Sequence, residues 1–283
     1  VWRSYFIHGS GEIRLIMTQS FYIISWMDVL VSFVLIALSI GLIRWMKIGL
    51  EQSLIIGTIR TFLQLGLMGY VLTWFFTQDN WLFMVCLILG MILIAGFEGT
   101  RRQKEYKIPH LFWILTGSIL TAVLIVLGII LKFILDVEPW FYPYAMIPIA
   151  GMIIGNALNS STLAVNRFIG EMKHREHEIE MLLSLGASPR NAIDDAMKSA
   201  LRAALLPNIN GLMMVGLVQL PGVMTGQILS GVDPLIAVRY QIMIMYMWIS
   251  TVAITDILVL LLVYRQFFTE KAQLKKSLLR SAL

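Results

Sequence analysis

Seven stretches of this chain contain at most one charged residue each. They are residues 26–43, 54–76, 81–97, 111–131, 140–165, 211–229 and 241–264. A helix rises about 1.5 Å per residue, so roughly 20 apolar residues cross a bilayer core. Only 14% of the residues are charged, against about 25% in a soluble domain. The pattern predicts an all-α, polytopic integral membrane bundle of about seven transmembrane helices, and it excludes a soluble enzyme.

Lys and Arg are concentrated in alternate connecting segments. Residues 44–53, 98–110, 166–210 and 265–283 hold 17 of the 22 Lys and Arg residues. Such segments face the cytoplasm in most membrane proteins. We therefore expect the N-terminus outside, the C-terminus in the cytoplasm, and a multi-pass protein of a bacterial inner membrane. The net charge of +5 is then explained by these loops, and no nucleic acid partner is expected.

Five regions follow from this division. Residues 1–16 differ from the rest and are expected to be a non-native or upstream extension, with Met17 as the natural start. Residues 17–165 are expected to form transmembrane helices one to five, and residues 208–264 helices six and seven. Between them, residues 166–207 are expected to form cytoplasmic coupling helices. Residues 265–283 form a basic cytoplasmic tail.

The insert at residues 166–207 is the one long polar stretch. Its apolar residues follow a helical spacing up to Gly186, which permits a helix end, and Pro189 suits the first turn of a new helix. Helix, sharp turn, helix is the predicted form. One reading is an amphipathic hairpin on the inner leaflet. Another is docking to a partner, because the small residues of the turn allow close approach.

The insert resembles the EAA loop of ABC importer permeases, which docks into a cleft of the partner ATPase. Glu180 lies six residues before Gly186, and Leu206–Pro207 follows further on, although Met181 and Leu182 replace the usual alanines. The resemblance implies an ATPase-coupling role for five residues. These are Glu180, Leu185, Gly186, Ala187 and Ser188.

Two GxxxG pairs lie in the predicted spans, and such spacing lets helices pack closely in lipid. The predicted helix-packing residues are Gly151, Gly155, Pro221, Gly222 and Gly226. Polar residues within or beside spans point by default to a functional interior. The translocation-pathway candidates are Arg60, Gln64, Asn156, Asn159, Gln219, Met224, Gln227, Gln241 and Asp256. Arg60 and Asp256 are alternatively an ion pair, or Arg60 reaches the headgroups along its stem.

Metal-binding motifs are weak in this sequence. Cys86 is the only cysteine and is expected to serve packing, while His174 and His177 fit a solvated helix face. No cluster of His, Cys or carboxylates lies within the predicted spans, so no metal site is assigned.

The order of IPIAGMIIGNALN, SLGASPRNA, VGLVQLPGVMTGQILSGVDP and AVRYQIMIMY resembles the FetB-type permease family. Its members are membrane subunits of a bacterial iron-export ABC transporter, related to a plant aluminium-tolerance protein. The resemblance covers Trp26 to the C-terminus. It implies a permease, with a homodimer expected, that works with a separate cytoplasmic ATPase in metal homeostasis or oxidative-stress resistance.

The chain contains no G-x-x-x-x-G-K-[ST] run to cradle nucleotide phosphates. We therefore expect no catalytic residues and no cofactor on this chain, with ATP and Mg on the partner. Two alternatives stay open. One is an ion-coupled secondary transporter in which Arg60 and Asp256 are the coupling charges, and the other is a membrane scaffold or sensor without transport.

Overall fold

The computed structural model describes residues 25–76, 81–103, 106–130, 132 and 143–279. These residues form helices, and apart from two isolated β-bridges no strand occurs among them. The all-helical prediction is therefore confirmed. The chain divides into a first unit, residues 1–62 and 221–239, and a second unit, residues 63–220 and 240–283. The expected extension at residues 1–16 and the start at Met17 lie outside the described residues.

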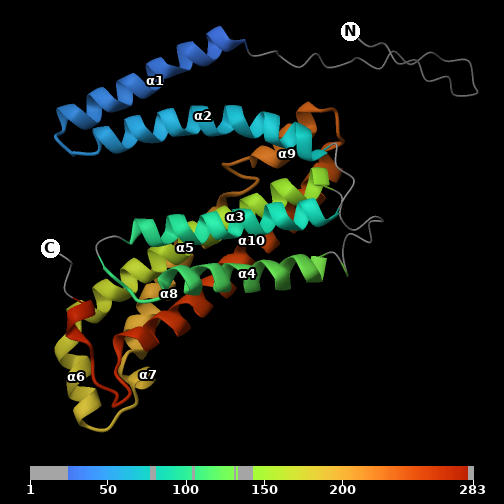
Figure 1. Cartoon of the computed structure of the whole chain (residues 1–283). Coiled ribbons are helices and arrows are strands. Elements are labelled where there is room, and N and C mark those ends of the chain that lie inside the picture. The colour runs from blue at the N-terminus through green and yellow to red at the C-terminus, as the bar shows by residue number, and fades with distance from the viewer. Residues whose placement is uncertain (1–24, 77–80, 104–105, 131, 133–142, 280–283) are drawn as a thin grey trace, which may run out of the picture. The chain divides into compact units, whose positions relative to one another are not determined.

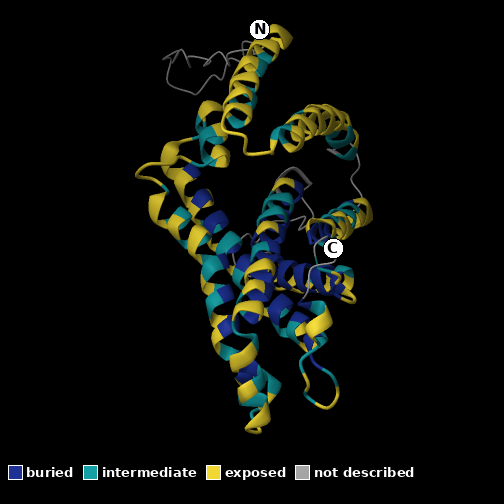
Figure 2. Cartoon of the chain, turned by 90° about the vertical axis from the view of Figure 1, so that its left-hand side faces the viewer, coloured by how far each residue is buried: buried dark blue, intermediate teal, exposed yellow. Residues whose placement is uncertain are grey.

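The first unit contains α1 (Trp26–Trp45), the start of α2 (Glu51–Phe76), α9 (Gly222–Leu229) and the start of α10 (Pro234–Val263). Ser25 and Asp28 form a reciprocal capping box that begins α1. The Asp233 carboxylate accepts the backbone N–H of Leu235 at 2.8 Å and so begins α10. Helix α1 has no buried residue and is drawn largely yellow in Figure 2.

The second unit contains most of the helices. They are α3 (Trp81–Arg102), α4 (Leu111–Ile130), α5 (Pro143–His174), α6 (Glu176–Ser184), α7 (Pro189–Ala192), α8 (Asp194–Met214), the 3₁₀ turn η2 (Tyr264–Phe267) and η3 (Lys276–Leu278). Most of α10 also belongs here. Figure 1 shows α3, α4 and α5 running together, with α6 and α7 at one end.

Among the residues that the structure describes, five helices are long and apolar enough to cross a membrane: α1, α2, α3, α4 and the helical stretch Pro234–Phe267. The predicted sixth span, residues 211–229, is not one helix. Helix α8 ends at Met214, the chain bends at Gly216 with φ of 82°, and α9 begins after Pro221. Glycine tolerates the positive φ that this bend requires. The helices also cross the expected limits of the insert, because α5 continues to His174 and α8 continues through Pro207.

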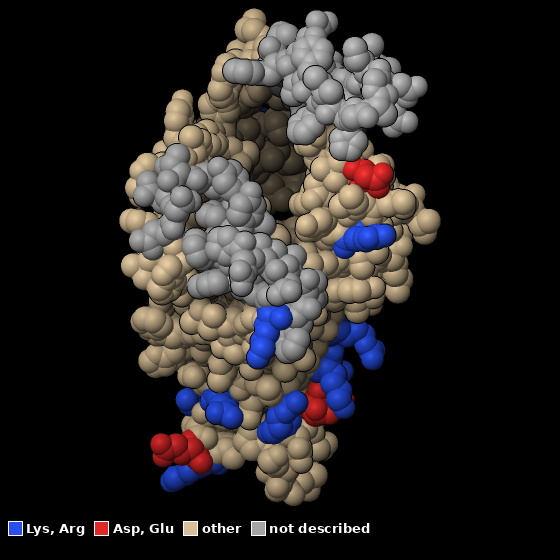
Figure 3. Space-filling view, turned by 90° about the vertical axis from the view of Figure 1, so that its right-hand side faces the viewer, with Lys and Arg blue, Asp and Glu red and all other residues tan. Residues whose placement is uncertain are grey.

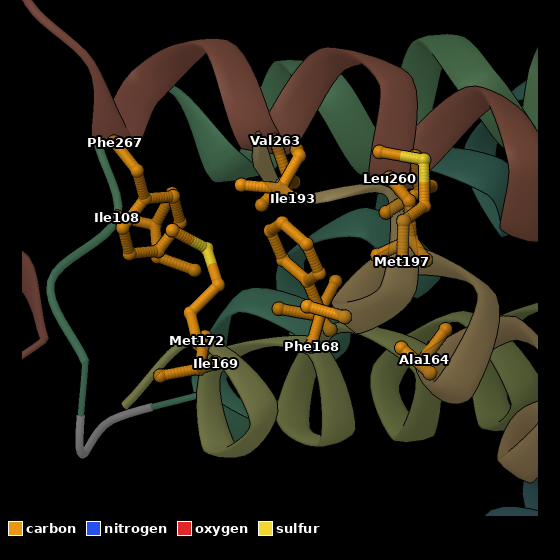
Figure 4. Close-up of a cluster of buried hydrophobic side chains, with 14 of the residues drawn as sticks. Ile108, Ala164, Phe168, Ile169, Met172, Ile193, Met197, Leu260, Val263 and Phe267 are labelled. Carbon is orange, nitrogen blue, oxygen red and sulfur yellow. The ribbon is translucent and has the colours of Figure 1, made fainter. Parts of the chain in front are cut away.

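Two hydrophobic cores lie along α5. The membrane core joins α3, α4, α5 and Met247 of α10. The insert core is formed by α4, α5, α6, α7 and α8 together with the end of α10 and the C-terminal tail. The Phe168 side chain of α5 points toward Ile193 and Val263, as Figure 4 shows, and its ring meets Phe267 edge-on at 6.1 Å. The insert is therefore packed onto the membrane helices through a continuous apolar contact.

Candidate coupling site

The predicted turn follows α6 and has a well-defined hydrogen-bond pattern. Gly186 donates its N–H to the Leu183 carbonyl at 3.0 Å, and Ala187 donates to the Leu182 carbonyl at 3.0 Å. These two bonds form a Schellman motif, in which the residue after the cap adopts a left-handed conformation. Gly186 has φ of 91°. A side chain at this position would strain the backbone, which explains why glycine ends the helix.

The chain leaves the turn through a second cap. The Ser188 hydroxyl accepts the backbone N–H of Asn191 at 3.3 Å, and Pro189 occupies the first helical position of α7. Both ends of the turn are thus fixed by local sequence.

The tip of the insert exposes apolar surface. Leu185 is 77% exposed and Met181 is 56% exposed, whereas Ile179, on the opposite side of α6, is 1% exposed. Among the described residues, no atom lies within 4 Å of a Cβ built at Gly186. Charged side chains gather at the end of the second unit that carries α6 and α7 (Figure 3). The turn is therefore an open, partly apolar surface within a charged region.

Glu180 is held by the C-terminal tail. Lys276 lies 2.7 Å from a Glu180 carboxylate oxygen and 3.2 Å from one of Glu176. Hydrogen bonds to Glu180 and then to Glu176 raise the pKa of Lys276 above its ordinary value. The tail is folded back on itself, because Lys275 donates its N–H to the Phe267 carbonyl at 2.7 Å. Sequence reasoning missed Lys276, since 96 residues separate it from Glu180.

An arginine joins three helices at the base of the insert. Arg175 lies 3.3 Å from Glu171 of α5, 3.6 Å from Glu178 of α6 and 3.8 Å from Asp195 of α8. Glu171 also accepts a hydrogen bond from Ser199 of α8 at 2.9 Å. These contacts set the angle between α5, α6 and α8, although each exposed pair alone contributes little stability.

A buried polar cluster lies where α5, α8 and α10 meet. The Ser160 hydroxyl oxygen lies 2.6 Å from an Asp256 side-chain oxygen, and Asn208 donates its amide to Ser160 at 3.3 Å. Asp256 is fully buried and its second carboxylate oxygen, Oδ1, has no partner among the described residues. Sequence reasoning found Asp256 but not Ser160 or Asn208. Arg60 belongs to the first unit, so its pairing with Asp256 stays a prediction.

Further polar contacts lie beside this cluster. Arg102 of α3 donates to the Asn159 side chain at 2.7 Å, and Gln103 donates to the Thr162 carbonyl at 2.9 Å. Asn156 donates to the Met152 carbonyl within α5. Among the described residues, no group of three or more His, Cys, Asp or Glu side chains could hold a metal ion.

The other pathway candidates are spread over both units. Gln64 and Gln219 are exposed in the second unit, and Gln241 is buried there with an unpartnered side-chain oxygen. Met224 and Gln227 lie in α9 of the first unit. Their role in a pathway stays a prediction.

The glycines differ in what surrounds them. A Cβ at Gly151 would lie 2.9 Å from the Met91 methyl, whereas no described atom lies within 4 Å of one at Gly155, Gly222 or Gly226. The close helix contact is instead at Gly96 of α3, where a Cβ would overlap the Thr116 hydroxyl of α4. Sequence reasoning missed Gly96, although the run Ala95–Gly96 with Gly99 offered a small-residue signal.

The comparisons with known proteins identify the family. A model described as "Uncharacterised protein family (UPF0014)" matches residues 26–268. The chain belongs to the UPF0014 family. No solved structure matches it.

Three relatives show how far the family similarity of this UPF0014 protein extends. The Bacillus subtilis "UPF0014 membrane protein YjkA" is 37% identical over 87% of this chain and 95% of its own length. The Escherichia coli "Probable iron export permease protein FetB" is 33% identical over 81% of this chain and 86% of its own. "Protein ALUMINUM SENSITIVE 3" of Arabidopsis thaliana is 34% identical over 86% and 87%. The resemblance to FetB-type permeases is confirmed, and the chain is a multi-pass membrane permease of this family.

Proposed function

We propose that this UPF0014 protein is the permease subunit of an ATP-driven ABC exporter. The observation that carries the proposal is the open turn at Gly186, presented at the tip of a packed helical insert. Leu185 and Met181 are exposed there although the turn lies beyond the apolar spans. An exposed apolar patch outside the bilayer marks a contact with another protein. We assign this contact to a cytoplasmic ABC ATPase.

The insert core provides a route for movement from the turn to the spans. Ile179 of α6 packs in the same core as Phe168 of α5 and Val263 of α10. Packed interiors transmit displacement, because they have low compressibility. A push on α6 during ATP hydrolysis would therefore reach α5 and α10 directly. Lys276 adds a second link, since it fixes Glu180 to the tail that follows α10.

The assembly proposed here has two permease subunits and two ATPase subunits, with ATP and Mg bound by the ATPase. The absence of a phosphate-binding glycine loop from this sequence supports an external energy source. The orientation with the tail in the cytoplasm is part of the same proposal.

We propose iron or a related metal species as the exported substrate, for metal homeostasis and oxidative-stress resistance. The support is the relative named as an iron export permease and the relative named for aluminium sensitivity. The described residues offer no three-ligand metal cluster. A chelated metal, held by dispersed polar groups, fits this sequence as well as a free ion does.

The first experiment is affinity purification of the tagged full chain from its native membrane, followed by identification of co-purifying ATPases. A stoichiometric ATPase whose turnover rises with iron is the expected result. A partner without an iron response would overturn the proposed substrate and keep the ATPase coupling. No ATPase together with gradient-driven flux would overturn the proposal in favour of an ion-coupled carrier. A soluble partner without any flux would indicate a scaffold.

The turn itself is tested by two substitutions in the reconstituted complex. Leu185→Asp removes apolar contact without changing the backbone, and Gly186→Trp adds bulk at the turn. We expect both to abolish ATP-driven transport while the protein still inserts. Gly170→Trp is the matched control, because Gly170 is an exposed glycine of α5 with no described atom within 4 Å of its Cβ position. Normal ATPase binding and transport in the Leu185 and Gly186 variants would contradict the proposed docking site.

A further inference from the structure

The contacts of Asp256, Ser160 and Asn208 allow two different arrangements of hydrogens. The Ser160 oxygen lies 2.6 Å from Asp256 Oδ2 and 3.3 Å from the Ala204 carbonyl oxygen, and both are hydrogen-bond acceptors when Asp256 is ionised. A serine hydroxyl has one hydrogen and can donate to only one of them. The Asn208 amide donates to Ser160 at 3.3 Å and to the Ala204 carbonyl at 3.0 Å.

A proton on Asp256 allows Ser160 to hydrogen-bond to both Asp256 and the Ala204 carbonyl. The carboxyl then donates from Oδ2 to the Ser160 oxygen, and Ser160 donates its own hydrogen to the Ala204 carbonyl. Each of these two contacts then has one donor and one acceptor. The 2.6 Å separation fits an O–H···O bond in either direction, so burial decides between the two arrangements.

The surroundings also favour a neutral carboxyl. Asp256 Oδ1 is buried without a partner among the described residues, and an unpaired buried charge costs far more than an unpaired carbonyl oxygen. Between Arg239 and Arg265 the sequence contains no charged residue other than Asp256.

The charged groups on the helices packed against Asp256 are engaged elsewhere or exposed. On the α5 side, Arg102 of α3 donates to Asn159, next to Ser160, and lies 3.9 Å from Glu98. On α8, Arg202 is exposed two residues before Ala204. None of these cations pairs with Asp256 in the described part of the chain.

We propose that Asp256 is a proton-binding site of the membrane domain, and that its proton joins α10 to α5 and α8 through Ser160. When the proton leaves, Ser160 retains one hydrogen for two acceptors and the contact between α5 and α8 weakens. Helix α8 begins directly after α7 and the coupling turn. Proton occupancy is therefore linked to the position of the insert, whichever energy source drives transport.

Infrared spectroscopy of the full chain in lipid nanodiscs tests the protonation directly. Selective ¹³C labelling of the seven aspartates separates their carboxyl signals from those of glutamates. At neutral pH we expect the C=O stretch of a protonated aspartic acid in the wild type. The band should be absent in Asp256→Asn, shifted in Ser160→Ala, and unchanged in Asp195→Asn, whose side chain is 72% exposed. A wild-type spectrum without this band, or with a band that Asp256→Asn retains, would overturn the proposal.

Thermal unfolding provides an independent measurement. The folded state holds a proton that the exposed aspartate of the unfolded chain releases, so stability falls as the pH rises from the acidic range in which a free aspartate ionises, until the folded protein releases the proton as well. The amide of Asp256→Asn donates to Ser160 at every pH. We expect the wild-type Tm to fall relative to this variant as the pH is raised from the acidic range through neutrality. Parallel Tm curves would overturn the proposal, and the wild-type infrared spectrum decides the question if the variant does not insert.

Discussion

The two halves of α5 bury side chains equally well in different surroundings. Ile153 lies in the membrane core and Ile169 in the insert core, and both are fully buried. In the insert, water is the alternative to burial, so the hydrophobic effect stabilises the packing. In the bilayer, lipid tails are as apolar as isoleucine, and close packing alone stabilises the contact. One helix thus combines two physical bases of stability.

The matched substitutions Ile169→Ala and Ile153→Ala are expected to have the largest effect and to test the comparison most directly. Ile169→Ala should lower the free energy of unfolding by about 2–5 kcal/mol, because it loses transfer energy and leaves a cavity. Ile153→Ala should lower the free energy of unfolding by less, because burial of the Ile153 side chain in the membrane core does not remove it from water. Unfolding in mixed micelles, followed by circular dichroism, measures both. Equal losses would show that the two cores do not differ in this way.

Gly96→Ala should have the next largest effect. The added methyl group would overlap the Thr116 hydroxyl, and such overpacking costs about 1–3 kcal/mol. Gly90→Ala on the same helix is the control, because no described atom lies within 4 Å of its Cβ position. A lower Tm for Gly96→Ala alone would support close α3–α4 contact as the source of membrane-core stability. Equal Tm values would argue against it.

Lys276→Glu should have a smaller effect, confined to the insert. It replaces attraction to Glu176 and Glu180 by repulsion, so the tail should exchange backbone hydrogens faster. Lys275→Glu, a neighbouring charge reversal, is the control. Hydrogen exchange of residues 268–279 measures the difference, which should diminish at high salt. Unchanged exchange would mean that the apolar residues of the tail hold it alone.

The smallest expected effect is the pH dependence of the same contact. The carboxylates raise the pKa of Lys276, so its stabilising contribution is complete below the ordinary lysine pKa and is lost as the pH rises through the raised value. Tail protection should therefore decline in alkaline solution in the wild type and change less in Lys276→Met. The same decline in both proteins would assign it to another group.

Features of the fold that depend on nearby residues could be predicted from the sequence. The capped turn at Gly186 and Ser188 follows from hydrogen bonds between residues at most five positions apart. The sixth span was less predictable, because Gly216 and Pro221 break a stretch whose hydropathy alone indicates a continuous helix.

The partners of the site residues could not be predicted. Glu180 and Asp256 were found because a carboxylate is conspicuous at those positions, but Lys276 and Ser160 have ordinary local sequence. Each is brought to its carboxylate across 96 residues of chain. Gly96 was missed because helix proximity depends on how α3 and α4 pack.

The sequence by itself determined that the bilayer is the solvent of this protein, most of its helical spans and the turn that ends α6, since hydropathy and caps act over a few helical turns. Only the tertiary structure decided which polar groups meet. Helix packing fixes where side chains distant in sequence lie, and a single hydroxyl shared by Asp256 and Ala204 becomes visible only when α5, α8 and α10 are in place.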